Sequence, residues 1–144
     1  MPSVIGIPGQ SRRILDIGSG SGLLVHLFAE IAGEASLVIG VEHVDGLRDL
    51  GEANMRKSAC GSSLLDTGRV EFHCSDGRQG WPESGTANKT DGEEGKWDVV
   101  HVGAAAFKFH DVLAQQLRSP GRLFIPIAED QDDWQSGQTK SLGC

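Results

Sequence analysis

Short apolar runs alternate along the chain with segments that carry apolar residues at helical spacing. Such runs, bounded by turn residues, are typical of strands that are buried on both faces of a parallel sheet. The predicted strands cover residues 12–17, 36–42, 69–74, 97–102 and 122–127. Their alternation with helices predicts a doubly wound α/β fold, with the ligand at the carboxyl ends of the first, second and fourth strands.

Amphipathic helices are expected between these strands, including a short one at about 110–117. The first helix is expected from about Ser21 to Ala32, where Gly33 provides a stop. Its sheet-facing residues are expected to be Leu24, Leu27, Phe28 and Ile31. The second helix begins near Asp45, a favourable N-cap. The side chains that it is expected to turn toward the sheet are Leu47, Leu50 and Met55.

The first predicted strand leads into a glycine-rich loop, Asp16-Ile17-Gly18-Ser19-Gly20-Ser21-Gly22. Glycines let the backbone turn sharply and let a ligand approach it closely, and the helix that follows directs free N–H groups toward that ligand. A dinucleotide fingerprint would require its third glycine at Leu23 or Val25, which disfavours an NAD-dependent reductase. The pattern looks like motif I of class I S-adenosylmethionine-dependent methyltransferases, whose cationic cofactor suits the acid before the loop. The alternative is an ordinary glycine-rich turn.

A second acid closes the next predicted strand. The segment Ser36-Leu37-Val38-Ile39-Gly40-Val41-Glu42 is apolar nearly throughout, and Glu42 lies 20 residues beyond Gly22. An acid at about this distance from the glycine loop can accept hydrogen bonds from both hydroxyls of a ribose. Glu42 by itself does not distinguish NAD from S-adenosylmethionine, and the alternative is a solvated glutamate at a strand end.

Length, charge and cysteine content limit the possible functions. The 144 residues suffice for one domain with a core, and a net charge of −7 with a pI near 5.1 argues against non-specific nucleic-acid binding. No apolar run approaches the length of a membrane span, and the N-terminus lacks the core of a signal peptide. The three cysteines, Cys60, Cys74 and Cys144, form no zinc framework, and the five histidines show no metal-ligand spacing. We therefore expect a cytoplasmic protein with reduced thiols and without metal, nucleic acid or membrane partners.

The chain is expected to consist of a core with irregular ends. Residues 1–11 predict an irregular segment, 12–127 the core and 128–144 a disordered tail. Residues 82–95 are polar and rich in glycine, which predicts a flexible insertion in the core. The last predicted strand is apolar and nothing around it is suited to cover it, which leaves an edge open to association. The pattern predicts a sheet that is incomplete at both flanks, as in the middle of a larger domain. If the chain folds, we expect it to be a monomer.

Three further motifs follow or contain the later strands. They are Ser75-Asp76-Gly77-Arg78, His101-Val102-Gly103-Ala104-Ala105-Ala106 and Pro120-Gly121-Arg122-Leu123-Phe124-Ile125-Pro126-Ile127. Together with the glycine loop and Gly40-Val41-Glu42-His43, they resemble the protein-L-isoaspartate O-methyltransferase family of eukaryotic type, from about Arg13 to Ile127. The resemblance implies a Rossmann-like class I methyltransferase fold. It also implies transfer of a methyl group from S-adenosylmethionine to the α-carboxylate of L-isoaspartyl residues in damaged proteins.

The resemblance assigns a role to each matching residue. The cofactor-binding residues would be Asp16, Gly18, Gly20, Ser21, Gly22, Glu42, His43, Asp76 and Gly77. The substrate-side loop would comprise His101, Val102, Gly103, Ala104 and Ala105. The family's N-terminal motif with its active-site serine is absent from residues 1–10, so the catalytic residue is unknown. For Asp76-Gly77 the alternative is a β-turn, and for His101 it is a hydrogen-bonded core histidine.

Two other functions stay open. The first alternative is a truncated remnant that binds the cofactor but catalyses weakly or not at all. Such a remnant could associate with another chain through its free strand edge. It is alternatively a methyltransferase for another acceptor, such as a small molecule, because one cofactor loop serves many reactions.

Overall fold

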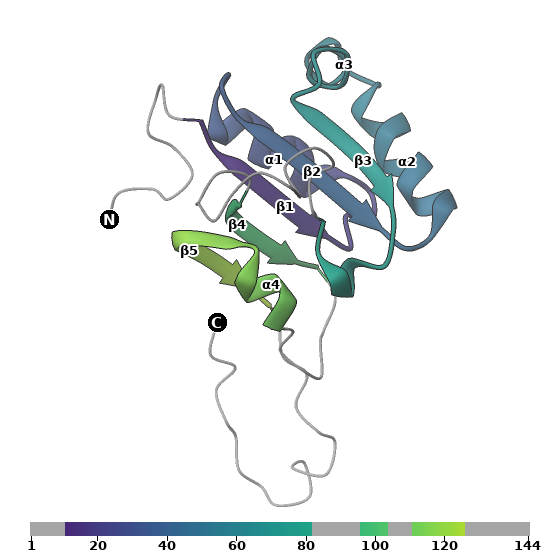
Figure 1. The fold of residues 1–144 in the computed structure, drawn as a ribbon. Coiled ribbons are helices and arrows are strands. Elements are labelled where there is room, and N and C mark those ends of the chain that lie inside the picture. Colours follow the sequence, from purple (N-terminus) through teal and green to yellow (C-terminus); the bar gives the residue numbers. More distant parts are fainter. Residues whose placement is uncertain (1–10, 82–95, 104–110, 126–144) are drawn as a thin grey trace, which may run out of the picture.

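The computed structural model describes residues 11–81, 96–103 and 111–125, which form one sheet flanked by helices (Figure 1). The strands are β1 (Arg13–Ile17), β2 (Leu37–Glu42), β3 (Val70–Cys74), β4 (Trp97–Val102) and β5 (Leu117–Phe124). The helices are α1 (Leu23–Ala32), α2 (Asp45–Met55), α3 (Ala59–Asp66) and α4 (Asp111–Gln115), with a short 3₁₀ helix, η1 (Gly77–Gln79). Within these residues, no helix has the length and apolar character needed to cross a membrane.

All neighbouring strands are parallel, in the order β3-β2-β1-β4-β5. The chain moves outward from β1 to β3 and then returns to place β4 on the other side of β1, so the strand order reverses between β1 and β4. Ligands bind at such a reversal in doubly wound sheets, because the loops on either side diverge there. The predicted doubly wound fold is confirmed, and β3 and β5 are the sheet edges within the described residues.

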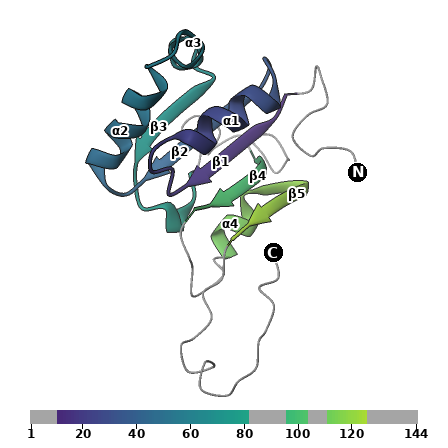
Figure 2. The same cartoon turned by 180° about the vertical axis from the view of Figure 1, so that it is seen from behind.

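Two apolar layers cover the two faces of the sheet. One layer joins α1, α2 and α3 to alternate strand residues such as Ile14 and Val99. The other joins α4 to the intervening strand residues, such as Leu15 and Val100. Successive residues of a strand point to opposite faces, so unbroken apolar runs bury the central strands on both sides. Figure 2 shows α1 and α2 lying across one of these faces.

The first helix turns a different face to the sheet from the one predicted. The buried residues of α1 are Val25, Ala29 and Ala32. The predicted face is largely exposed, with Leu24 at 40 %, Leu27 at 42 % and Ile31 at 55 %, and Phe28 is partly buried. Close packing explains the difference, because a Cβ placed on Gly40 of β2 would lie only 3.0 Å from Cγ2 of Val25. The small or β-branched residues of α1 therefore face the sheet, and its leucines lie on the flanks.

In α2 the prediction is correct for Met55 and wrong for the two leucines. Met55 is buried, whereas Leu47 and Leu50 are 40 % and 45 % exposed. The other buried residue of α2 is Gly51, and a Cβ placed there would lie 3.0 Å from the ring of Phe72 in β3. The helix therefore approaches the sheet through a glycine, which an apolar-residue count does not reveal.

The sequence predicted the end of α1 but neither the helix α3 nor the start of β5. Gly33 ends α1 with a φ of +86°, as predicted. The helix α3 was not predicted, and its N-cap is Ser58, whose hydroxyl accepts a hydrogen bond from the N–H of Gly61 at 3.0 Å. The strand β5 begins at Leu117 rather than at residue 122, because Leu117 already pairs with β4 before a shift of register. The predicted irregular N-terminal segment up to residue 10, the insertion at 82–95 and the tail at 128–144 lie outside the described residues.

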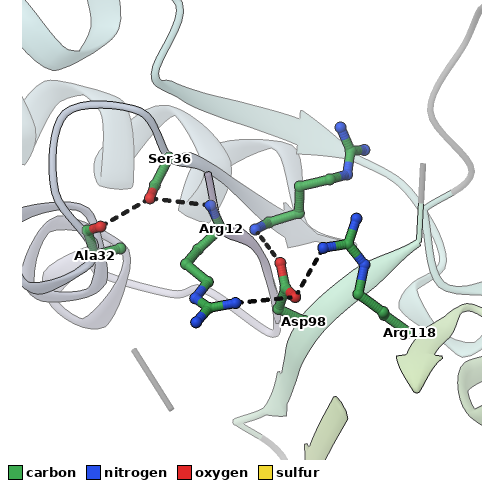
Figure 3. Close-up of polar contacts among 6 residues, drawn as sticks. Arg12, Ala32, Ser36, Asp98 and Arg118 are labelled. Atoms are coloured by element: carbon green, nitrogen blue, oxygen red, sulfur yellow. Dashed lines mark hydrogen bonds and ion pairs between the residues drawn. The ribbon is translucent and has the colours of Figure 1, made fainter. Parts of the chain in front are cut away.

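A buried carboxylate joins three strands at the amino end of the sheet (Figure 3). Asp98 of β4 is 3 % exposed, and its Oδ2 accepts a hydrogen bond from the backbone N–H of Arg13 at 2.8 Å. Its Oδ1 lies 3.4 Å from Nη1 of Arg118 and 3.8 Å from Nη1 of Arg12. The backbone N–H of Arg12 also donates to the hydroxyl of Ser36, just before β2, at 3.3 Å. These contacts hold β1, β4 and β5 together at the end of the sheet opposite to the glycine loop.

Candidate functional site

The loop after β1 and Gly103, the residue that follows β4, lie together at the carboxyl end of the sheet, where the strand order reverses. The N–H of Gly18 donates to the carbonyl oxygen of Val41 at 2.7 Å, and the N–H of Gly103 donates to that of Ile17 at 2.7 Å. A Cβ on Gly103 would lie 2.9 Å from the carbonyl oxygen of Gly18. Backbone hydrogen bonds therefore fasten the start of the glycine loop to β2 and Gly103 to the end of β1.

The glycine loop adopts a conformation that other residues rarely adopt. Its three alternating glycines have positive φ angles, +76° at Gly18, +52° at Gly20 and +80° at Gly22. Crowding adds a second requirement at Gly22, where a Cβ would lie 3.0 Å from Cα of Gly51 and 3.1 Å from the ring of Phe72. Both the backbone conformation and the packing therefore explain the spacing of the glycines.

Glu42 at the end of β2 holds this loop in place. The residue is 4 % exposed, and its Oε2 accepts a hydrogen bond from the N–H of Gly20 at 3.1 Å. Its Oε1 lies 3.3 Å from Nδ1 of the exposed His43. One carboxylate thus brings together three residues to which the resemblance assigns cofactor binding, and it orders the glycine loop.

Two polar residues that sequence reasoning missed also shape the loop. The hydroxyl of Ser19 is buried and has no hydrogen-bond partner among the described residues. The side-chain amide of Asn54 in α2 donates to the carbonyl oxygen of Ser21 at 3.1 Å. A buried hydroxyl without a partner is unfavourable, so Ser19 is suited to bind a polar group of a ligand. Ser19 lies between motif glycines and Asn54 lies in a helix without a motif, and neither position carries a sequence signal.

Asp16 and His101 form a pair across β1 and β4. They are direct partners in the strand register, and Oδ1 of Asp16 lies 2.7 Å from Nδ1 of His101. Asp16 is 1 % exposed, and this burial raises its pKa, while the hydrogen bond with His101 acts in the opposite direction. The ring of His101 also packs edge-on against Phe28 at a centroid distance of 5.8 Å. His101 is thus a hydrogen-bonded, packed histidine that still exposes a quarter of its side chain at the site.

The segment Asp76-Gly77 forms a turn that lies against the end of β1. The carboxylate of Asp76 accepts a hydrogen bond from the backbone N–H of Arg78 at 3.1 Å, and its Oδ2 lies 2.8 Å from Nη2 of the same arginine. These hydrogen bonds lower the pKa of Asp76 to about 2. A Cβ on Gly77 would collide with Ile17. Position 77 therefore requires a glycine, because the backbone passes close to the side chain of Ile17.

The other predicted site residues fall into two groups. Val102 is buried in the apolar layer on the α4 side, so its side chain belongs to the core. Ala104 and Ala105 lie outside the described residues.

A family model for protein-L-isoaspartate(D-aspartate) O-methyltransferase matches residues 7–141 of this chain. The chain belongs to the protein-L-isoaspartate O-methyltransferase family. It is 37 % identical over 121 residues to the protein-L-isoaspartate O-methyltransferase of Triticum aestivum, and 39 % identical over 131 residues to protein-L-isoaspartate O-methyltransferase 1 of Arabidopsis thaliana. These alignments cover 84 % and 91 % of this chain, and 48 % and 52 % of the relatives. The chain thus spans about half the length of these curated relatives.

Solved structures support the same assignment. A protein-L-isoaspartate O-methyltransferase homologue of Plasmodium falciparum, in complex with S-adenosyl-L-homocysteine, aligns with a TM-score of 0.67 and 28 % identity. That alignment covers 83 % of this chain and 53 % of the other. A further protein-L-isoaspartate O-methyltransferase aligns with a TM-score of 0.62 and 27 % identity, over 81 % of this chain and 31 % of the other. The predicted family and the Rossmann-like class I methyltransferase fold are therefore confirmed.

Proposed function

We propose that this chain forms the cofactor-binding part of a protein repair methyltransferase. The enzyme transfers a methyl group from S-adenosylmethionine to the α-carboxylate of L-isoaspartyl residues in damaged proteins. The observation that carries the proposal is the glycine loop, which Glu42 holds at the strand reversal and in which Ser19 keeps a buried hydroxyl without a partner among the described residues. Membership in the protein-L-isoaspartate O-methyltransferase family supports the reaction, and the S-adenosyl-L-homocysteine complex of the Plasmodium homologue supports the cofactor.

The residues of the site fit this cofactor. When bound, S-adenosylmethionine supplies a methyl group on a positively charged sulfur. Asp16 and Glu42 are both buried and close enough for Glu42 to contribute to the raised pKa of Asp16, so they place negative charge where a cationic ligand is favoured. The residues proposed to hold the cofactor are Asp16, Gly18, Gly20, Ser21, Gly22, Glu42, His43, Asp76 and Gly77. We add Ser19 to this proposal because its hydroxyl is buried without a hydrogen-bond partner among the described residues.

The acceptor determines what the protein has to provide. A carboxylate is already ionised at neutral pH, so methyl transfer to it requires no strong general base. Alignment of the acceptor and exclusion of water are the main remaining contributions. We assign these to the loop from His101 to Ala105, since His101 is held at 2.7 Å by Asp16 and Gly103 is fastened to β1 beside the glycine loop. Asp16 then both positions His101 and contributes negative charge to the cofactor site.

The proposed setting of this reaction is the cytoplasm, with damaged proteins and peptides as partners and the chain as a monomer. The free and exposed thiols of Cys60 and Cys74 support a reducing compartment. Association through the edge strand β5, where Phe124 is 52 % exposed, is the alternative to the monomer.

Binding and turnover are tested separately. Isothermal titration with S-adenosyl-L-homocysteine is expected to give saturable one-to-one binding, weakened by Glu42→Gln and unchanged by Glu71→Gln, an exposed carboxylate of β3. Transfer of a radiolabelled methyl group to an isoaspartyl peptide is then expected to give a base-labile ester. No binding by a folded sample would refute the cofactor site. Binding without any ester at high protein concentration would refute the catalytic proposal and favour the cofactor-binding remnant.

A further inference from the structure

A second cluster of reactive side chains lies between α1 and α3. His26 and Glu30 are four residues apart on α1, and Cys60 lies in α3. Residues spaced by four lie on the same face of a helix, so the imidazole and the carboxylate project side by side. The fold brings the thiol of Cys60 to this face, and one ligand atom from each residue lies within 4.8 Å of the others.

Two of the three distances between ligand atoms are close to those of a metal centre. Nε2 of His26 lies 3.0 Å from Oε1 of Glu30, and Sγ of Cys60 lies 3.5 Å from the same oxygen. Around tetrahedral Zn²⁺, bonds of about 2.0 Å to nitrogen, 2.1 Å to oxygen and 2.3 Å to sulfur place neighbouring ligand atoms about 3.3–3.7 Å apart. Adjustments of a few tenths of an ångström therefore suffice for these two pairs. Glu30 and Cys60 are exposed, so their side chains are free to make them.

The nitrogen of His26 is the most informative atom of the cluster. Nε2 is buried and has no hydrogen-bond partner among the described residues, although Glu30 lies at ion-pair distance. The contact therefore has the length of a hydrogen bond without its direction. A neutral imidazole protonated on Nδ1 leaves a lone pair on Nε2, which is the form that binds metal ions.

The charges of the cluster also suit a divalent cation. The carboxylate of Glu30 and the thiolate of Cys60 together balance a charge of +2. Binding would replace the thiol proton, which Cys60 now directs toward Glu30, and would release it to solvent. The nearby guanidinium of Arg69 is engaged elsewhere, because it donates to the carbonyl oxygens of Ala29 and Gly33 in the last turn of α1.

We propose that His26, Glu30 and Cys60 form a zinc site that joins α1 to α3, with a water molecule as the fourth ligand. One nitrogen, one oxygen and one sulfur ligand favour Zn²⁺ over Mg²⁺ and Ca²⁺, which prefer oxygen ligands. The site is independent of methyl transfer, since none of its residues belongs to the proposed cofactor site. It departs from the absence of metal expected from the sequence, because His26 and Cys60 are far apart in the chain and no short motif contains both.

Cobalt(II) chloride is the probe for this site, because Co²⁺ replaces Zn²⁺ and a Co²⁺–thiolate bond gives a near-ultraviolet charge-transfer band. Titration of the full chain under reducing conditions is expected to produce this band with one-to-one stoichiometry, and zinc chloride is expected to abolish it. Cys60→Ser should remove the band. His26→Gln should weaken binding by at least about 10–100-fold, the usual cost of disturbing even the outer partners of a metal site.

The two remaining cysteines provide the controls. Cys74→Ser and Cys144→Ser should leave the band and the affinity unchanged, since Cys74 lies at the end of β3 and only Cys60 has a histidine and a glutamate beside it in the described part of the chain. Zinc chloride should also raise the Tm of the wild type but not that of Cys60→Ser, because a ligand that binds only the folded state stabilises it. The absence of a band in the wild type, or its survival in a folded Cys60→Ser variant, would overturn the proposal.

Discussion

At the amino end of the sheet lies one buried carboxylate, that of Asp98. It accepts a hydrogen bond from a backbone N–H at 2.8 Å and forms ion pairs with two guanidinium groups. At the carboxyl end two buried carboxylates, Asp16 and Glu42, lie near each other, and neither is paired with a guanidinium group within the described residues. Asp16 has the imidazole of His101, and Glu42 has one N–H of the glycine loop and an exposed imidazole. In the part of the chain that the structure describes, buried carboxylates are thus neutralised by cations at one end of the sheet and only partly compensated at the other.

This difference separates stability from function. Burial of a charge is unfavourable unless partners compensate it, so the amino end is arranged for folding. The carboxyl end keeps a raised pKa at Asp16 and, among the described residues, a buried Ser19 hydroxyl without a hydrogen-bond partner. Both are local costs that a bound ligand would relieve. Substitutions at the two ends should therefore affect different measurements.

The largest effect is expected at the amino end. Asp98→Ala leaves two arginines and a backbone N–H without their common acceptor and should reduce the free energy of unfolding by about 3–5 kcal/mol, as for other broken buried ion pairs. Asp66→Ala, which removes an exposed partner of Arg56, is the control and should have a much smaller effect. Urea denaturation measures both. Similar losses of unfolding free energy in the two variants would show that the buried ion pairs of Asp98 contribute no more to stability than an exposed ion pair does.

The glycine loop gives the next largest effect. In Gly22→Ala the alanine must adopt a left-handed backbone conformation, which costs about 1–2 kcal/mol of folding free energy. Its methyl group would also lie 3.0 Å from the backbone of Gly51. Gly68→Ala is the matched control, because Gly68 has a similar φ of +73° with nothing within 4 Å of its added Cβ. Gly22→Ala should therefore lose more stability than Gly68→Ala, and only Gly22→Ala should lose affinity for S-adenosyl-L-homocysteine. Equal changes of stability and of affinity in the two variants would mean that the crowding at Gly22 affects neither folding nor binding.

The sheet was predictable from sequence to a greater degree than the faces of the helices. The strand β4 coincides with the predicted 97–102, because an unbroken apolar run bounded by polar segments has few other interpretations. By contrast, α1 is apolar on more than one side, so periodicity could not decide between its leucines and the set that packs on the sheet. That choice depends on the close approach of Val25 to Gly40, which is a property of the folded pair.

In the candidate site, too, some features were predictable from the sequence and others were not. The glycines and Glu42 were predictable because positive φ angles and an acid at the end of a strand leave a motif in the sequence. The pairing of Asp16 with His101 was not, because it follows from the register of β1 against β4 across 85 residues of chain. Burial of the Ser19 hydroxyl likewise depends on how the loop folds and has no sequence signature.

A smaller effect, confined to binding, is expected at Glu42. Glu42→Gln keeps an oxygen that can accept the hydrogen bond from Gly20 but removes the charge, so stability should change little. Affinity for S-adenosyl-L-homocysteine should fall by about 1–3 kcal/mol, the usual contribution of a hydrogen bond to a charged group. Isothermal titration measures the loss, with Glu71→Gln as the control. Unchanged affinity would remove Glu42 from the cofactor site and leave it the structural role of ordering the loop.

A pH-dependent change in stability, which tests the comparison most directly, is expected at Asp16. Burial raises the pKa of this carboxyl above 3.8, so the stability that the protonated form contributes is fully present below that pH and is lost as the pH rises through the folded-state pKa. The side-chain amide of an Asp16→Asn variant does not titrate. The free energy of unfolding of the wild type relative to this variant should therefore decrease from pH 3.8 toward neutrality, until the variant is at least as stable as the wild type.

Urea denaturation over this pH range measures the difference. The same series in a His101→Gln background shows how much of it depends on the hydrogen bond between Asp16 and His101. At neutral pH, Asp16→Asn is also expected to bind S-adenosyl-L-homocysteine more weakly than the wild type. The amide oxygen of the variant can still accept the hydrogen bond from His101, so the loss of affinity would reflect the missing charge. A variant that instead becomes progressively less stable than the wild type as the pH rises would show that His101 fully compensates Asp16. The two ends of the sheet would then neutralise their buried carboxylates in the same way, and the contrast between them would not hold.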